Sequence, residues 1–225
     1  MPNPTPALSF SLTYAQAAAA LLFVDPDDIR DQLNAVHVEL GAGGDAVAVA
    51  TDGAALAVLR IRCIDLGNGG GAVTIPRELL DSAVRAMKSR KAWRASSLAV
   101  NVYAADEFGP SADKRRTVHV MTVAGEFNAP EIGISFPDWR RVIPATANGQ
   151  PAQYGGELLA RFERAAQLLA GPQACPVCAS NGDDAPALVE ITGDAFGVLM
   201  PRRIRNREAA TVKRPQWLDV QSATH

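Results

Sequence analysis

The chain has 225 residues, of which 48% are hydrophobic and 20% charged, a balance typical of a globular protein of one large or two small domains. No apolar run approaches the roughly 20 residues that a membrane-spanning helix needs. The N-terminus lacks the basic start of a secretory signal, and three cysteines cannot all pair with one another. We therefore expect a soluble, cytoplasmic protein with no membrane partner.

The net charge of -2 is unevenly distributed along the chain. Residues 201–225 contain six Lys or Arg against two Asp or Glu, a local charge of +4, which leaves -6 on the other 200 residues. An acidic body argues against a general nucleic-acid binder. It does not exclude a protein that encloses DNA loosely with a few local cations.

The first part of the chain alternates predicted strands with predicted helices. Thr13 is placed to cap a helix over 14–23, which Asp25-Pro26 ends. The Asp52-Gly53 pair is typical of a hairpin turn between two strands. The predicted strands of this part span 8–12, 33–40, 46–49, 56–61 and 73–75.

A second helix is predicted over 77–91, because Pro76 suits the start of a helix and apolar residues then recur at helical spacing. Two further strands, 98–103 and 117–123, follow it. This order favours an α+β domain over 8–144, with an antiparallel sheet and both helices on one face of it.

A linker over 145–151 precedes a smaller predicted unit. Its helix spans 157–170 and stops at Gly171-Pro172. A loop over 175–184 and a hairpin formed by 188–191 and 196–200 follow. We expect the basic tail, 205–225, to be mobile because it has little apolar content.

Three distant segments, Val47–Val58, Phe136–Pro144 and Val198–Ile204, each resemble part of the bacterial replicative sliding clamp, the beta subunit of DNA polymerase III. Three more segments match in the same order: Arg30–Glu39, Thr74–Leu80 and Glu157–Ala166. Any one match is weak, whereas the ordered set is fairly specific. Residues 8–144 resemble the complete middle domain of a clamp subunit. Residues 152–204 resemble parts of the last domain, and the family's first domain has no counterpart here.

The resemblance implies a DNA-clamp fold and a groove that captures a Leu or Phe of a partner peptide. Ala54-Ala55 stands where the family often has His-Arg, so polar contacts at the rim are lost. The alternative is that these residues are ordinary core and inter-domain contacts. The implied peptide-binding residues are Leu33, Thr51, Gly53, Leu56, Pro137, Arg141, Val142, Val198, Leu199, Met200 and Pro201.

The second helix is the candidate DNA-facing element, because clamp helices face the enclosed duplex and meet phosphates without reading bases. The alternative is a solvated helix face, the usual environment of such charges. The candidate DNA-facing residues are Arg77, Arg85, Lys88, Arg90 and Lys91.

Other chemistry is weakly indicated. Cys175 and Cys178 have the spacing of half a zinc site, but no second pair completes the four ligands that a structural zinc needs. Two free thiols, or a pair completed by a second copy, are the alternatives. We expect no cofactor and no metal. With no nucleophile beside a placed base and no phosphate-binding loop, we expect the chain not to be an enzyme.

The sequence thus predicts a sliding-clamp-like replication accessory, or processivity, protein. Its expected partners are replication or repair proteins that carry clamp-binding peptides, and double-stranded DNA if a ring forms. A homo-oligomer is a further candidate assembly. One alternative is a clamp mimic that competes for those peptides without encircling DNA. A structural scaffold is another.

Overall fold

The structure, a computed structural model, describes residues 5–25, 27, 29–41, 44–63, 70–88, 95–105 and 115–202, without the side chains of Arg62 and Cys63. The predicted DNA-facing residues Arg90 and Lys91 and the predicted basic tail, 205–225, lie outside this part. The larger, N-terminal region runs β1 (Leu8–Thr13), α1 (Tyr14–Leu21), β2 (Ala35–Leu40), β3 (Asp45–Thr51), β4 (Ala55–Cys63), β5 (Gly71–Pro76), α2 (Arg77–Lys88), β6 (Ser97–Tyr103), β7 (Thr117–Thr122) and β8 (Gly125–Pro130). A short 3-10 helix, η2 (Trp139–Val142), then precedes α3 (Gly156–Ala170), β9 (Val177–Ala179), β10 (Ala187–Thr192) and β11 (Ala195–Leu199).

The predicted α+β class is confirmed, and two strands were missed by the sequence analysis. The missed strand β8 has the sequence Gly-Glu-Phe-Asn-Ala-Pro, in which Gly, Asn and Pro are poor strand formers. The other missed strand, β9, is only three residues long and lies in the predicted loop. Both strands form by pairing with a stronger neighbour, β7 and β10 respectively.

The first ten elements repeat one unit twice, a strand followed by a helix and a three-strand meander. The first unit is β1-α1-β2-β3-β4 and the second is β5-α2-β6-β7-β8. The first strand of each unit pairs with a strand of the other unit: β1 pairs with β6, and β5 pairs with β2. At the start of α1, Thr13 and Gln16 form a reciprocal capping box, which fixes where the helix begins.

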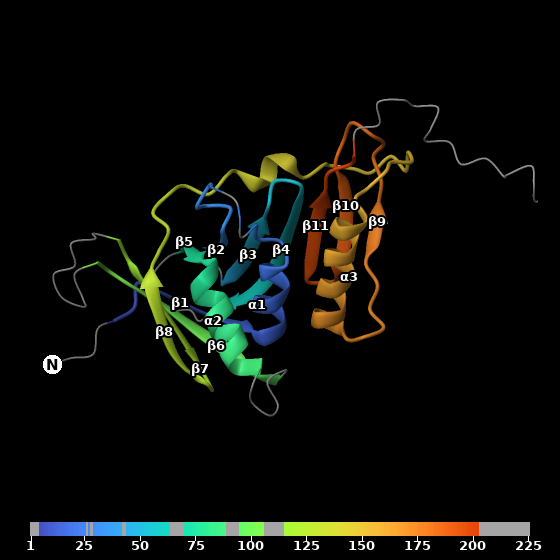
Figure 1. Ribbon diagram of the computed structural model, residues 1–225. Helices are drawn as coiled ribbons and strands as arrows, with labels where there is room; N and C mark the ends of the chain where they lie inside the picture. The colour runs from blue at the N-terminus through green and yellow to red at the C-terminus, as the bar shows by residue number, and fades with distance from the viewer. Residues whose placement is uncertain are drawn as a thin grey trace, which may run out of the picture.

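Strand β4 links the larger region to the smaller one (Figure 1). One edge of β4 pairs with β3 along most of its length. Its other edge pairs with β11 over residues 55–59 and then with β1 at Arg62 and Cys63. All these pairs are antiparallel. Because β4 pairs with strands of both regions, the described strands form one connected sheet.

The helices lie together on one face of this sheet (Figure 1). Helix α1 packs between α2 and α3, and the rings of Phe23 and Phe162 meet edge to face with centroids 4.8 Å apart. Phe162 also lies over Gly197 of β11, where a Cβ would come within 2.4 Å of the ring. The smaller region therefore shares both a sheet and a core with the larger one.

The opposite, outer face has a second apolar cluster. Strand alternation places Ala48, Ala57 and Leu199 toward the helices and their neighbours outward. The outward cluster contains Val49, Leu56, Val58, Trp139 and Val198. No helix in the described part of the chain is long and apolar enough to cross a membrane.

Candidate peptide-binding site

A pocket of about 220 Å³ opens on the outer face where β4 and β11 meet. Its floor is built by Leu56 of β4 and Val198 of β11, which lie opposite each other in the sheet. Typical pockets for whole small ligands are larger, about 300–1,000 Å³, so this one suits a single anchoring side chain or two. The full lining comprises Arg30, Leu33, Thr51, Gly53, Ala54, Ala55, Leu56, Pro137, Asp138, Trp139, Val142, Val198 and Met200.

The turn between β3 and β4 forms one end of the pocket and is held by side chains. Asp52 Oδ1 accepts hydrogen bonds from the backbone N–H groups of Ala54 and Ala55, at 2.8 and 2.7 Å. Thr51 Oγ1 donates to the carbonyl of Ala55 and accepts from Gly53 N–H. Gly53 has φ +87°, a left-handed conformation that favours glycine. The predicted hairpin turn is therefore present, and the Asp52 side chain caps it.

A connector, residues 131–143, crosses the outer face and supplies another wall of the pocket. At its start, Ile132 N–H donates to Thr74 O of β5, at 3.0 Å. Arg116 forms a bidentate ion pair with Glu131 and donates a hydrogen bond to Ala72 O. This bond satisfies one backbone carbonyl on the free edge of β5. The connector is thus attached to the sheet before it reaches the pocket.

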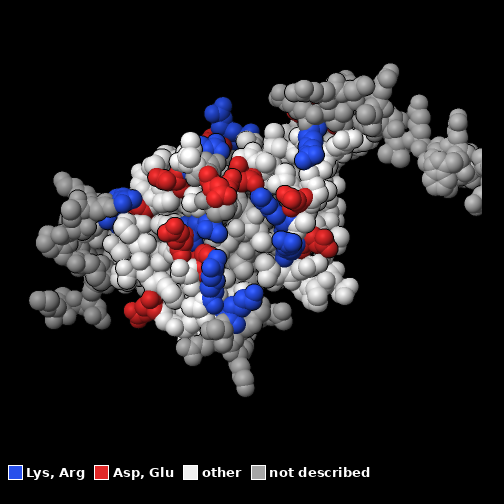
Figure 2. Space-filling model, viewed as in Figure 1, with Lys and Arg blue, Asp and Glu red and all other residues white. Residues whose placement is uncertain are grey.

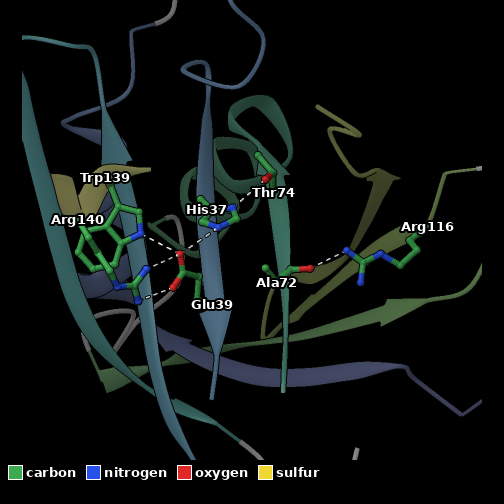
Figure 3. Close-up of polar contacts among 7 residues, drawn as sticks. All are labelled: His37, Glu39, Ala72, Thr74, Arg116, Trp139 and Arg140. Carbon is green, nitrogen blue, oxygen red and sulfur yellow. Dashed lines mark hydrogen bonds and ion pairs between the residues drawn. The ribbon is translucent and has the colours of Figure 1, made fainter. Parts of the chain in front are cut away.

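A polar latch formed by Glu39, Trp139 and Arg140 fastens the end of the connector (Figure 3). Glu39 of β2 accepts from the indole N–H of Trp139 at 2.8 Å and from two guanidinium nitrogens of Arg140 at 3.1 and 2.6 Å. The guanidinium also stacks over the Trp139 ring, 4.1 Å from its centroid. These hydrogen bonds, those from Arg140 first, lower the pKa of Glu39. The latch places Trp139 in the outer cluster, and Val142, three residues later, lines the same pocket as Met200.

His37, two residues before Glu39, extends the latch. Its ring stacks on Phe136 with centroids 4.6 Å apart, and its Nδ1 lies 2.9 Å from the Thr74 hydroxyl. Its Nε2 lies 3.5 Å from Glu39. Burial lowers the pKa of His37 despite the opposing effect of Glu39. The neutral ring therefore forms part of the connector's packing at neutral pH.

Of the eleven residues that the sequence analysis assigned to the groove, eight line this one pocket. The other three are placed differently. Leu199 is fully buried in the main core, because it follows Val198 in a strand and points to the opposite face. Arg141 is exposed in η2, and Pro201 is half-buried just beyond the pocket.

Five of the lining residues were not among the predicted peptide-binding residues: Arg30, Ala54, Ala55, Asp138 and Trp139. Trp139 is only 7% exposed although it lies in a connector without regular strands. A tryptophan in a connector is itself a signal of a packed site, because its large ring favours burial and its N–H then needs a hydrogen-bond partner.

The candidate DNA-facing helix has a mixed charge in its described part. Arg77, Arg85 and Lys88 lie on α2 together with Glu78 and Asp81, and Arg85 pairs with Asp81 at 2.9 Å. Figure 2 shows acidic and basic side chains interspersed over the face that bears the helices. The basic surface that the sequence suggested is therefore partly neutralised where the structure describes it.

Cys175 and Cys178 are both exposed free thiols. Among the described residues, no group of three His, Cys, Asp or Glu side chains is arranged to hold a metal ion. Neither observation supplies the second half of a zinc site.

The fold is that of the bacterial sliding clamps, the beta subunits of DNA polymerase III. A DNA polymerase III beta subunit from Pseudomonas aeruginosa matches with a TM-score of 0.62 and 16% identity over 91% of this chain and 68% of that one. A Helicobacter pylori beta clamp bound to a DNA ligase peptide matches with a TM-score of 0.60 and 10% identity, over 90% of this chain and 67% of that one. No protein-family model and no curated protein matched the sequence.

Proposed function

We propose that this chain is a sliding-clamp-like accessory protein of DNA replication that binds short peptide segments of polymerases or other replication and repair proteins. The observation that supports this most is the convergence of three distant segments on one apolar pocket. A clamp of the same fold binds a DNA ligase peptide, which makes a peptide the natural candidate ligand here.

The pocket has the properties that a peptide anchor requires. Its floor residues are buried, whereas Val142 and Met200 at its mouth are 45% and 43% exposed and can be covered by a ligand. Full burial of one Leu or Phe side chain contributes about 1.5–3 kcal/mol. The flexible Met200 side chain can adjust to different anchors. Such a site favours several related peptides over a single rigid ligand.

A titration with synthetic peptides tests this proposal. The probe is a ten-residue peptide with a Leu-Phe pair, and its matched control has Ala-Ala at the same positions. We expect micromolar affinity for the first, about -8 kcal/mol, and at least tenfold weaker binding of the second. Met200→Ala should weaken binding, whereas Met121→Ala, at a similarly exposed methionine on β7, should not. Equal heats for both peptides would contradict a groove that selects an apolar anchor.

The second candidate is a clamp mimic that binds the same peptides without encircling DNA. The mixed charge on the described part of α2, where Arg85 pairs with Asp81, favours it, because a DNA-facing helix gains affinity from unpaired cations. Light scattering separates the two, since encirclement requires a closed oligomer. Retention on circular but not linear DNA, lost when Arg77, Arg85 and Lys88 are replaced by Glu, would support the ring. A monomer without retention would support the mimic.

A further inference from the structure

A second pocket, of about 430 Å³, lies on the outer face at the opposite end of β11. Its floor is formed by Val47, Val58 and Phe196, of which Val47 and Phe196 are only partly buried. It shares no lining residue with the candidate peptide groove, which begins at Leu56 and Val198 on the same two strands. The fold does not need this cavity, and the proposed function does not use it.

The rim of this pocket is acidic. Among the lining residues whose side chains the structure describes, Asp45, Glu190 and Asp194 face one cation, Arg60. Arg60 lies 3.4 Å from Asp45 and 3.9 Å from Asp194, and all three of these side chains are more than half exposed. Exposed pairs of this kind contribute little, so an incoming cation can exchange with Arg60 at small cost. An apolar floor inside an acidic rim suits a segment that combines cations with an aromatic or aliphatic side chain.

We propose that the pocket binds the basic C-terminal segment of the same chain, residues 213–218. This segment has the sequence Lys-Arg-Pro-Gln-Trp-Leu and belongs to the part beyond Arg202. Its two adjacent cations complement the carboxylates of the rim. Trp217 and Leu218 supply apolar side chains for the floor, and tryptophan is one of the residue types enriched at interface hot spots.

The length of the tail permits this docking. The described chain ends at Arg202, whose N–H donates to Gln153 O at 2.7 Å. Ten residues separate Arg202 from Lys213, and extended chain spans up to about 3.3–3.6 Å per residue, or roughly 35 Å in all. Going back from Arg202 to Ala195, the first residue of β11, covers seven residues and requires about 23 Å.

Tethering makes even a weak contact effective. A segment joined by a short linker to the body that carries its binding site experiences an effective concentration in the millimolar range. A detached tail peptide with a millimolar dissociation constant would therefore be about half bound in the intact chain. We expect the segment to exchange between docked and free positions, with the docked position shielding the Phe196 ring.

The test uses the full chain labelled with 5-fluorotryptophan, with the ¹⁹F signal of Trp217 assigned by Trp217→Phe. We expect this signal to differ from that of a free synthetic peptide of residues 203–225. Reversing the charge of the rim with Glu190→Lys and Asp194→Lys should move the signal to the free-peptide position. This corresponds to a fall of at least tenfold in the equilibrium constant for docking. Reversing the tail instead, with Lys213→Glu and Arg214→Glu, should do the same, and combining both reversals should restore the docked signal.

A matched control is Asp138→Lys, an exposed carboxylate at the rim of the other groove, which should leave the signal unchanged. A Trp217 signal that equals the free peptide's in the wild-type chain would overturn the proposal. So would a signal that responds to Asp138→Lys or Met200→Ala but not to the rim reversal, since the tail would then occupy the peptide groove. Reversion to the free position on dilution would show docking onto a second copy and would overturn the intrachain contact.

Discussion

Arg161 of α3 forms an ion pair with Asp52 in the turn between β3 and β4, and this contact joins the two regions of the chain beside the groove. The Asp52 side chain is only 8% exposed, and its other oxygen accepts two backbone N–H groups of the turn. One carboxylate therefore shapes the turn and holds the helix of the smaller region against it.

We expect Arg161→Met to lower the free energy of unfolding by about 1.5–3 kcal/mol, because it leaves a buried carboxylate without its charged partner. Denaturant unfolding measures this loss. Arg164→Met, at an exposed position on the same helix, should change stability by less than about 0.5 kcal/mol. In a double-mutant cycle with Asp52→Asn, additive effects would show that the pair has no coupling energy.

Gly197→Ala should destabilise the junction of α3 and β11. An added Cβ would lie 2.4 Å from the Phe162 ring and 2.5 Å from the backbone oxygen of Leu56, which cannot move away without breaking the sheet. The expected loss is about 1–3 kcal/mol from overpacking. Gly193→Ala is the control, since nothing lies within 4 Å of its added Cβ. Equal melting temperatures for the two variants would contradict the close packing of Phe162.

Glu39→Gln should weaken peptide binding although Glu39 lies outside the pocket. The amide can still accept from Trp139, but it loses the charged pair with Arg140 that fixes the connector. We expect binding of the Leu-Phe peptide to fall three- to tenfold, with a stability loss of about 1 kcal/mol. Asp81→Asn removes a comparable Arg pair on α2, far from the pocket, and should leave affinity unchanged. Similar losses in both variants would indicate a general effect of stability rather than positioning of the groove wall.

Stability should fall as the pH drops below about 6.5, in part because of His37. Burial lowers its pKa from the ordinary value of 6.5, so the unfolded chain binds more protons between the folded pKa and 6.5. The stability contribution is complete above pH 6.5 and is lost as the pH falls toward the folded pKa, with a slope of at most about 1.4 kcal/mol per pH unit. Glu39, with a lowered pKa of its own, adds a further loss below about pH 4.5.

Urea unfolding of wild type and His37→Gln between pH 7.5 and 5 measures how much of the pH-dependent loss of stability comes from His37. The stability difference between the two should change with pH, and parallel curves would exclude His37 as the source. His119→Gln is a useful comparison, because burial lowers the pKa of His119 as well, in the presence of the nearby Glu126.

The sequence predicted most of the fold because its signals are local. Thr13, Asp52-Gly53 and the apolar stripe of α2 each act within a few residues. The weak strand β8 escaped detection because its conformation depends on pairing with β7. The latch could not be predicted either, because it also depends on a long-range contact. Glu39 and Arg140 are about a hundred residues apart, and neither is unusual in its own segment. Motif matching assigned both Val198 and Leu199 to the groove. Adjacent residues of a strand point to opposite faces, so only Val198 can line it.

The branching of β4 has a consequence for synthesis of the chain. Its edge over residues 55–59 has no strand partner until β11 is made, roughly 140 residues later. Contacts of such high sequence separation form slowly, because the loop between them must close first. A nascent chain would meanwhile present an unpaired strand edge flanked by valines and leucines, which favours aggregation. Folding yield should therefore depend on how quickly the last strand follows, and chaperones that shield strand edges should improve it more than lower temperature does.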